Sequence, residues 1–180
     1  MDRENVIQFI RSARARGETP IFFETDLRGI DLSAMDLRRV YMSGVNLGEA
    51  NLTGADLSWA YLREANLKQA NLSLATLSGA NLFRVDLTEA NLSEADLRRV
   101  NLRGANLSIA NLFRVNLRGS NLLRANLSGA NLAEATLIGV NPTGANLSRA
   151  NLIDANVTQE QLSIMGSLKQ ATMPDGTIHD

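Results

Sequence analysis

From residue 25 to residue 159 the sequence repeats every five residues, and this period excludes both regular secondary structures as the basis of the fold. Five residues advance an α-helix by about 500°, so successive equivalent residues lie about 140° apart and form no apolar stripe. On a continuous β-strand an odd period places successive equivalent residues on opposite faces. A chain with this pattern must therefore turn within every unit.

Each unit carries an apolar residue at its centre. The 26 centres run from Leu27 to Leu152, and 24 of them are leucine, the exceptions being Met42 and Pro142. A small or β-branched apolar residue, most often alanine, stands two positions before the centre, with Asn or Asp between the two. The two residues after the centre are mostly Ser, Thr, Arg, Gly and Glu. This division predicts that one part of every unit is buried and that the other part turns at the surface.

The unit at residues 50–54 illustrates how such a chain folds. Ala50 and Leu52 lie two positions apart and share one face of a short extended segment, while Asn51 points away from it. Thr53 and Gly54 then turn the chain. Repetition coils the chain into an all-β solenoid with Leu and Ala inside, whose coils stack at about 4.8 Å and satisfy each other's backbone groups.

The repeated run of Ala, Asn or Asp, and Leu, followed by two variable residues, resembles the pentapeptide repeat family over residues 25–157. Its regularity and its leucine centres resemble the cyanobacterial members in particular. The resemblance implies a right-handed quadrilateral β-helix with four units per coil, so that the chain forms about six to seven coils. The position of Pro142 fits this count, because its successor on the same face is position 162, beyond the repeats, where a missing N–H costs least.

The segment before the repeats is predicted to cover the first coil, which would otherwise expose unpaired backbone and core. Residues 1–19 are assigned to an N-terminal capping helix and linker, with the helix over residues 3–16, Asp2 as its N-cap and Gly17 as its end. Residues 20–157 are assigned to the pentapeptide-repeat β-helix. Within it, residues 20–24 form a degenerate first unit with Phe22 at its centre.

Residues 158–180 are assigned to a C-terminal cap and tail. Thr158 and Gln161 match a capping box, which predicts a short helical cap near residues 159–165. The run Pro174, Asp175, Gly176 is typical of a turn, here in a tail that frays. The apolar residues of this segment either cover the last coil or form a dimer through the terminal cap, so we expect a monomer or a dimer.

The composition argues against catalysis. The chain has no cysteine and a single histidine, His179, which excludes disulfides and thiolate metal sites and removes most acid–base chemistry. The repeated Asn and Asp residues are interpreted as scaffold that stabilises turns, and His179 as a disordered tail residue. We therefore predict that the protein is not an enzyme and has no catalytic, cofactor-binding or metal-binding residues.

Charge and hydropathy limit the expected partners. A net charge of −1 does not favour nucleic-acid binding, and no apolar run approaches the ~20 residues of a membrane helix. The charged N-terminus lacks the apolar core of a signal peptide. These features predict a cytoplasmic protein with no membrane partner.

With no catalytic site expected, the residues that face outward are the candidates for binding a partner. With four units per coil, basic residues outnumber acidic ones on the faces of Leu37 and Met42, and acidic residues predominate on the other two faces. Chance segregation on a solvated surface is the alternative explanation.

Most exposed aromatic residues fall on this basic side. Tyr41 and Tyr61 are 20 residues apart and should stack on neighbouring coils, with Trp59 close by and Phe83 between Arg63 and Arg103. Mutual stacking for stability and binding of a partner both explain such a cluster. The predicted patch for a partner consists of Arg38, Arg39, Tyr41, Trp59, Tyr61 and Arg63.

These features favour a non-enzymatic binding or scaffold protein that engages an unknown protein partner through the faces of the rod. The alternative, implied by the same resemblance, is a DNA mimic that binds DNA gyrase, as quinolone-resistance and mycobacterial members do. Near-neutral charge, leucine rather than phenylalanine centres and the absence of any loop within the register argue against that alternative. Direct nucleic-acid binding by scattered arginines is weaker still, since no recognition motif accompanies them.

Overall fold

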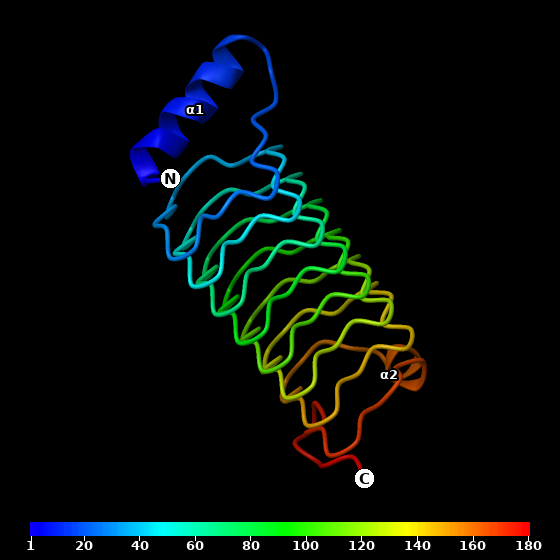
Figure 1. Ribbon diagram of the computed structural model, residues 1–180. Coiled ribbons are helices and arrows are strands. Elements are labelled where there is room, and N and C mark those ends of the chain that lie inside the picture. Colours follow the sequence, from blue (N-terminus) through cyan, green and yellow to red (C-terminus); the bar gives the residue numbers. More distant parts are fainter.

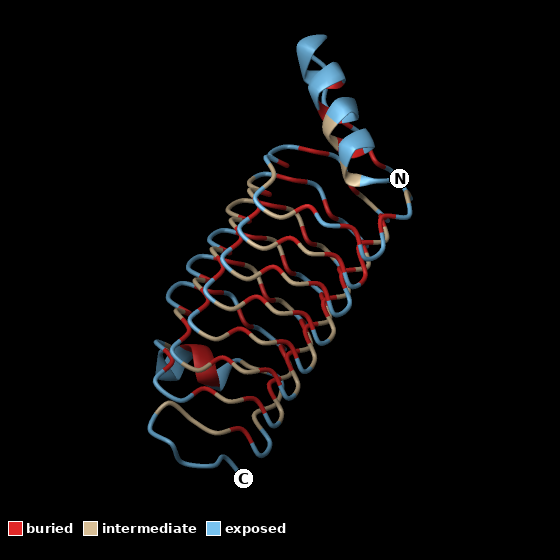
Figure 2. Cartoon of the chain, turned by 90° about the vertical axis from the view of Figure 1, so that its left-hand side faces the viewer, coloured by how far each residue is buried: buried red, intermediate tan, exposed pale blue.

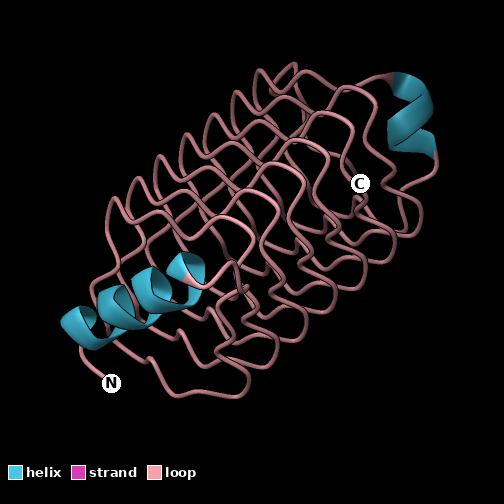
Figure 3. Ribbon diagram, turned by 90° about the horizontal axis from the view of Figure 1, so that it is seen from above, coloured by secondary structure: helices cyan, strands magenta, loops and turns pink.

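The computed structural model describes all 180 residues as one rod of stacked coils, with helix α1 at its N-terminal end and the C-terminus at the other end (Figure 1). Helix α1 spans Arg3–Ala15 and helix α2 spans Gln159–Ser163. Between them the chain forms no extended strand (Figure 3). Each unit instead makes single parallel bridges to the units 20 residues before and after it, as between Asn51 and Asn71. A coil of 20 residues contains four units, as the resemblance implied.

Every backbone N–H in a typical unit has an acceptor. In residues 51–55, the N–H groups of Asn51, Leu52 and Gly54 donate to carbonyls of the neighbouring coils at 2.7–2.9 Å. The N–H of Ala55 donates to the carbonyl of Leu52 at 3.0 Å and closes the turn. The fifth N–H, that of Thr53, donates to the side-chain Oδ1 of Asn51 at 3.2 Å. The Asn or Asp side chain therefore satisfies the one donor that the backbone cannot, which explains its recurrence.

The Asn side chains also connect the coils, a role that the sequence did not predict. Nδ2 of Asn111 donates to Oδ1 of Asn91 at 3.1 Å, and Nδ2 of Asn131 donates to Oδ1 of Asn111 at 3.2 Å. These side chains point away from the core, as expected, but they lie half-buried along a ladder that runs parallel to the rod axis.

The second residue of each corner adopts a positive φ, whatever its side chain. Nineteen residues other than glycine, from Glu24 to Gln170, have φ between 49° and 61°. This conformation costs an L-residue about 1–2 kcal/mol, and here the hydrogen bonds between coils hold it in place. Long side chains at this position lean onto the glycine 20 residues further on. A Cβ atom at Gly104, for example, would lie 3.5 Å from Cγ of Arg84.

The core is a continuous column of the unit centres and the small residues that precede them. All centres from Leu27 to Leu152 are buried, and the turn residues lie outside them (Figure 2). Most of these residues, together with Val6 and Ile10 of α1 and Leu162 of α2, form one cluster of 53 buried residues that runs the length of the rod. The predicted division between inside and outside is confirmed.

Helix α1 packs on the first coil. Asp2 caps it by accepting a hydrogen bond from the N–H of Asn5 at 2.8 Å, as predicted. Its buried residues are Val6, Ile10 and Ala13. Phe22 is 2% exposed at the centre of the first unit and meets Phe9 of α1 edge-on, with ring centroids 4.9 Å apart. Residues 20–24 are thus a degenerate first unit, as predicted.

Helix α2 replaces part of a coil beside the last units (Figure 1). The capping box of Thr158 and Gln161 is present, and the helix ends two residues earlier than predicted, at Ser163. Nε2 of Gln161 also donates to the carbonyls of Leu137 and Val140, at 2.7 and 3.1 Å. The segment therefore covers the face on which Pro142 is the last unit centre.

The chain after α2 pairs with the rod instead of fraying. Residues 167 and 172 bridge residues 21 positions earlier, so the segment containing α2 adds one residue to the coil. The turn at residues 174–176 then reverses the chain, and Thr172 bridges Ile178 in antiparallel fashion. The N–H of His179 donates to the carbonyl of Ala171 at 2.9 Å. The expectation of a disordered tail at His179 was wrong, because the hairpin supplies acceptors that the sequence pattern does not reveal.

We predict that Leu92→Asp severely destabilises the protein, whereas Ser93→Asp does not. Leu92 is completely buried mid-rod, so the variant places an unpaired carboxylate in the core and should cost more than about 4 kcal/mol. Ser93 belongs to the turn, and its variant should stay within about 0.5 kcal/mol of the parent. Chemical denaturation of the two purified variants tests this. Equal free energies of unfolding would overturn the division between inside and outside.

We predict that Asn111→Ala costs about 1–2 kcal/mol, because it removes two ladder bonds and the acceptor for the N–H of Phe113. Thr136→Ala is the matched control, since Thr136 occupies the same unit position and its side chain makes no hydrogen bond. The measurement is the shift in thermal midpoint of each variant. If both variants melt alike, the Asn ladder does not contribute to stability.

Candidate functional site

Residues 38–39, 58–59, 78–79, 98–99, 118–119 and 138–139 form one edge of the rod, here called the arginine corner. The parallel bridges stack these turns one above another. The corner contains no acidic residue and five arginines, namely Arg38, Arg39, Arg98, Arg99 and Arg118. The register of 20 residues thus supports the assignment of residues to faces from which the basic side was predicted.

Four residues of the predicted patch surround one hollow. Arg39, Tyr41, Trp59 and Tyr61, with Thr19 from the linker after α1, line a volume of about 440 Å³. The rings of Tyr41 and Tyr61 are parallel within 7°, with centroids 4.2 Å apart. The predicted stacking of these residues on neighbouring coils is confirmed.

Trp59 is held in place although it is 57% exposed. Its φ is 60°, the left-handed conformation of its corner position, and its ring lies directly over Gly79. A Cβ atom at Gly79 would approach Cε3 of Trp59 to 2.7 Å, closer than packed atoms allow. Only glycine at this position leaves room for the indole, so the ring packs on the backbone of Gly79 and forms an apolar platform on the surface.

Arg38 is neutralised by carboxylates beside it. Its guanidinium lies 2.8 Å from Asp36 and 3.6 Å from Asp56. The hydrogen bond from Arg38, with help from Arg14 of α1, holds the pKa of Asp36 well below its ordinary value of 3.8. These residues and Trp59 line a second hollow of about 570 Å³ that also includes Arg39.

Arg63 lies apart from the other patch residues, on the next corner. Its guanidinium pairs with Glu64 at 3.3 Å and lies 4.9 Å from the ring centroid of Phe83. Arg84 and Arg103 approach the same ring to 5.1 and 6.0 Å. The predicted position of Phe83 between Arg63 and Arg103 is confirmed, and the patch divides into a hollow near Trp59 and this cation–π cluster.

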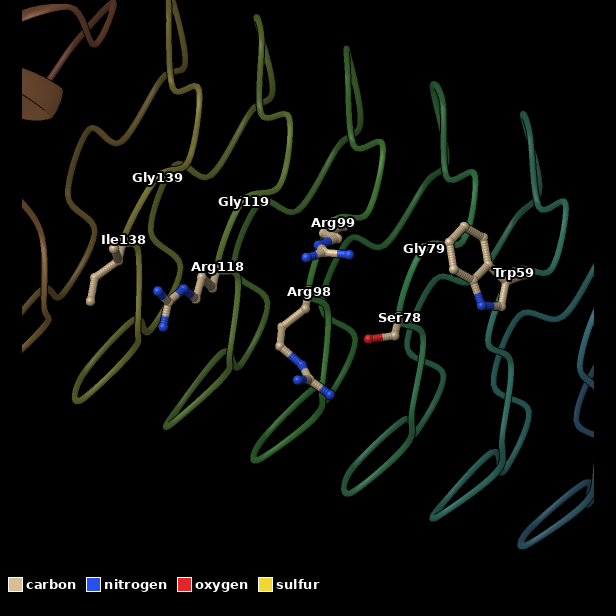
Figure 4. A pocket seen from close by; sticks show the side chains of 9 residues that line it. All are labelled: Trp59, Ser78, Gly79, Arg98, Arg99, Arg118, Gly119, Ile138 and Gly139. Carbon is tan, nitrogen blue, oxygen red and sulfur yellow. The ribbon is translucent and has the colours of Figure 1, made fainter.

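A larger groove on the arginine corner was missed by sequence reasoning. It has a volume of about 660 Å³ and runs from Trp59 to Ile138 (Figure 4). Its arginines are Arg98, Arg99 and Arg118, and its floor includes three glycines, at positions 79, 119 and 139. The signal for the groove was available in the sequence, because the intervals between these glycines are multiples of 20 residues and the glycines therefore stack on one corner, where side chains would otherwise fill the space.

No group of three or more His, Cys, Asp or Glu side chains is arranged to hold a metal ion. Neither helix has the length and apolar character needed to cross a membrane. Arg98 and Arg114 are paired, with Asp96 at 2.6 Å and Glu134 at 2.8 Å respectively.

Comparison with known proteins identifies the repeat. The family model for pentapeptide repeats matches in eight copies that together extend from residue 22 to residue 159. HetL, a pentapeptide repeat protein involved in heterocyst differentiation regulation in the cyanobacterium Nostoc sp. strain PCC 7120, is 28% identical, with a TM-score of 0.51 over 99% of this chain and 100% of HetL. No curated protein matches the chain.

Two further solved structures are more distant in shape. Rfr23, a pentapeptide repeat protein of the cyanobacterium Cyanothece 51142, is 27% identical over 81% of this chain and 93% of its own, with a TM-score of 0.32. QnrB1, a plasmid-mediated fluoroquinolone resistance protein, is 16% identical over 86% of this chain and 82% of its own, with a TM-score of 0.43. The family match and the similarity to HetL assign the right-handed quadrilateral β-helix to the rod. The chain belongs to the pentapeptide repeat family.

Proposed function

We propose that the protein is a non-enzymatic binding protein that holds a protein partner against the predicted patch on its basic side. The observation that carries this proposal is the Trp59 platform, an exposed indole fixed over Gly79 and bordered by Arg39 and the stacked tyrosines. Aromatic side chains have few rotatable bonds and lose little freedom on association, and both aromatic and arginine side chains are typical anchors of interfaces.

The distribution of polar groups supports a role without catalysis. Carboxylates at the Asx positions of the repeats accept hydrogen bonds from their own turns, as Asp56 does from the N–H and hydroxyl of Ser58. The single histidine lies in the C-terminal hairpin, at the other end of the rod from the patch (Figure 1). The cytoplasmic location and the choice between monomer and dimer stay predictions from the sequence.

We predict that the double variant Trp59→Ala, Arg39→Ala loses the partner. The immobilised protein is used to capture proteins from an extract of the cells that produce it, and capture is quantified by mass spectrometry. The captured amount of at least one protein should fall about tenfold or more, since both truncated side chains belong to the proposed binding patch.

The matched control is Leu74→Ala, Glu94→Ala. Leu74 and Glu94 occupy the same corner positions on neighbouring coils of another edge, and both adopt positive φ. This variant should retain the captured protein. If every protein is captured equally by both double variants, the patch does not bind a partner.

The DNA-mimic alternative is tested by a gyrase supercoiling titration with the purified protein, with and without a fluoroquinolone. We expect neither inhibition nor drug protection at micromolar concentrations. The acidic corner with Glu94 and Glu134 is interrupted by Arg114, which pairs with Glu134 at 2.8 Å, so it lacks the continuous negative charge of duplex DNA. Inhibition that Glu94→Gln, Glu134→Gln abolishes would establish the alternative.

A further inference from the structure

The groove on the arginine corner combines positive charge with apolar ends. Trp59 borders one end and Ile138 the other, and the arginines lie between them (Figure 4). Arg98 is partly neutralised because it pairs with Asp96. Arg99 and Arg118 have no carboxylate within ion-pairing distance, and no acidic residue lines the groove. Two uncompensated guanidinium groups thus face an open channel between two apolar side chains.

The depth of the groove follows from the order of side chains at the second corner position. Along the rod this position holds Trp59, Gly79, Arg99, Gly119 and Gly139. Trp59 leans over Gly79, and the stem of Arg99 leans toward Gly119, where a Cβ atom would lie 3.7 Å from its Cγ. At Gly139 a Cβ atom would meet only the backbone of Gly119, at 3.9 Å. No side chain of the preceding coil covers this last step, so the groove is open there on that side.

The length of the groove suits a short extended peptide. From position 59 to position 139 the chain makes four coil steps, which span about 19 Å at the ~4.8 Å spacing of bridged backbones. An extended peptide rises about 3.3 Å per residue, so about six residues fill that span.

We propose that this groove binds an extended acidic segment of a protein partner, with carboxylates facing Arg99 and Arg118 and an apolar residue at each end. Guanidinium groups pair with carboxylates through two parallel hydrogen bonds, which favours this chemistry at unpaired arginines. The apolar ends at Trp59 and Ile138 suit aliphatic side chains. A single-stranded nucleic acid would instead require successive stacking platforms, and the groove offers one ring only.

The inference goes beyond the proposed function, with which it shares Trp59, and specifies the chemistry of a partner. Trp59 is the only tryptophan of the chain, so its fluorescence reports occupancy of the groove directly. The probe is the peptide acetyl-Leu-Glu-Glu-Glu-Glu-Leu-amide, titrated at low salt. The same peptide with lysine in place of glutamate and the oligonucleotide dT6 serve as comparisons.

Two variants test the groove, one by removing its positive charge and one by filling its open step. Arg99→Ala, Arg118→Ala removes both unpaired guanidinium groups, and its control, Lys68→Ala, Arg124→Ala, removes the same charge from other corners. Gly119→Glu fills the groove and adds a carboxylate. Its control is Gly129→Glu on another corner, where φ is 67° against 70° and a Cβ atom would also lie 3.7 Å from the side chain 20 residues earlier.

The acidic peptide should change the Trp59 emission saturably, and both groove variants should weaken its binding at least about tenfold. Both controls should bind as the parent does, and all four variants should retain the thermal midpoint within a few degrees. The lysine peptide should not bind. Absence of saturable binding by the acidic peptide, or equal weakening by the control variants, would overturn the inference.

Tighter binding of dT6 than of the peptide would also overturn it, in favour of a nucleic-acid partner. The capture experiment tests the proposed function separately. If Trp59→Ala, Arg39→Ala abolishes capture of the cellular partner while Gly119→Glu leaves capture unchanged, the patch binds a protein but the groove does not. If the acidic peptide binds the groove and no cellular protein depends on Trp59 and Arg39, the patch proposal fails and the groove stands.

Discussion

The hydrogen bond between a unit centre and the carbonyl one coil further on is the constraint on which the rest of the rod depends. Leu52, for example, donates to the carbonyl of Asn71 at 2.7 Å, and this pattern recurs along the repeat. Within the repeats these bonds stay in register because each coil has 20 residues, so each corner must turn the chain toward the next face within two residues. The tight corner imposes a positive φ on its second residue, even where that residue is arginine, glutamate or tryptophan. The strain at the corners is therefore a consequence of the pairing between coils.

Because this pairing repeats in a fixed register, features that depend only on position within the repeat could be predicted from the sequence. The five-residue period and the Leu centres predicted the inside of the rod, and the spacing of Tyr41 and Tyr61 predicted their stacking, because both depend only on position within the repeat. The caps were predicted from local signals such as Asp2 and the capping box at Thr158. The number of units per coil and the hand required the family resemblance, since a period alone specifies neither.

Features that depend on how side chains are oriented toward the adjacent coil, and not on their spacing alone, were missed. The Asn ladder joins side chains 20 residues apart, and the C-terminal hairpin pairs Gln170 with His179 through a backbone bond of 2.7 Å. The groove near Arg99 and Arg118 depends on which side chain leans over which glycine, so it follows from the order of residues along one corner and not from any single motif. The patch itself was predicted from the assignment of residues to four faces, and the structure separates Arg63 from its other members.

The residues of the proposed patch lie at corner positions of the unit, except Tyr41 and Tyr61, which stand where most units have Asn or Asp. The three residues that build the core and the ladder admit few alternatives, while the two corner residues vary freely, as the run from Arg39 through Trp59 to Gly79 illustrates. Because the coils are stacked at a fixed spacing, the distance between two corner side chains is set by the number of coils between them. Corner positions are therefore spaced along the rod in steps of about 4.8 Å, and a substitution at one of them leaves the backbone spacing of the others unchanged.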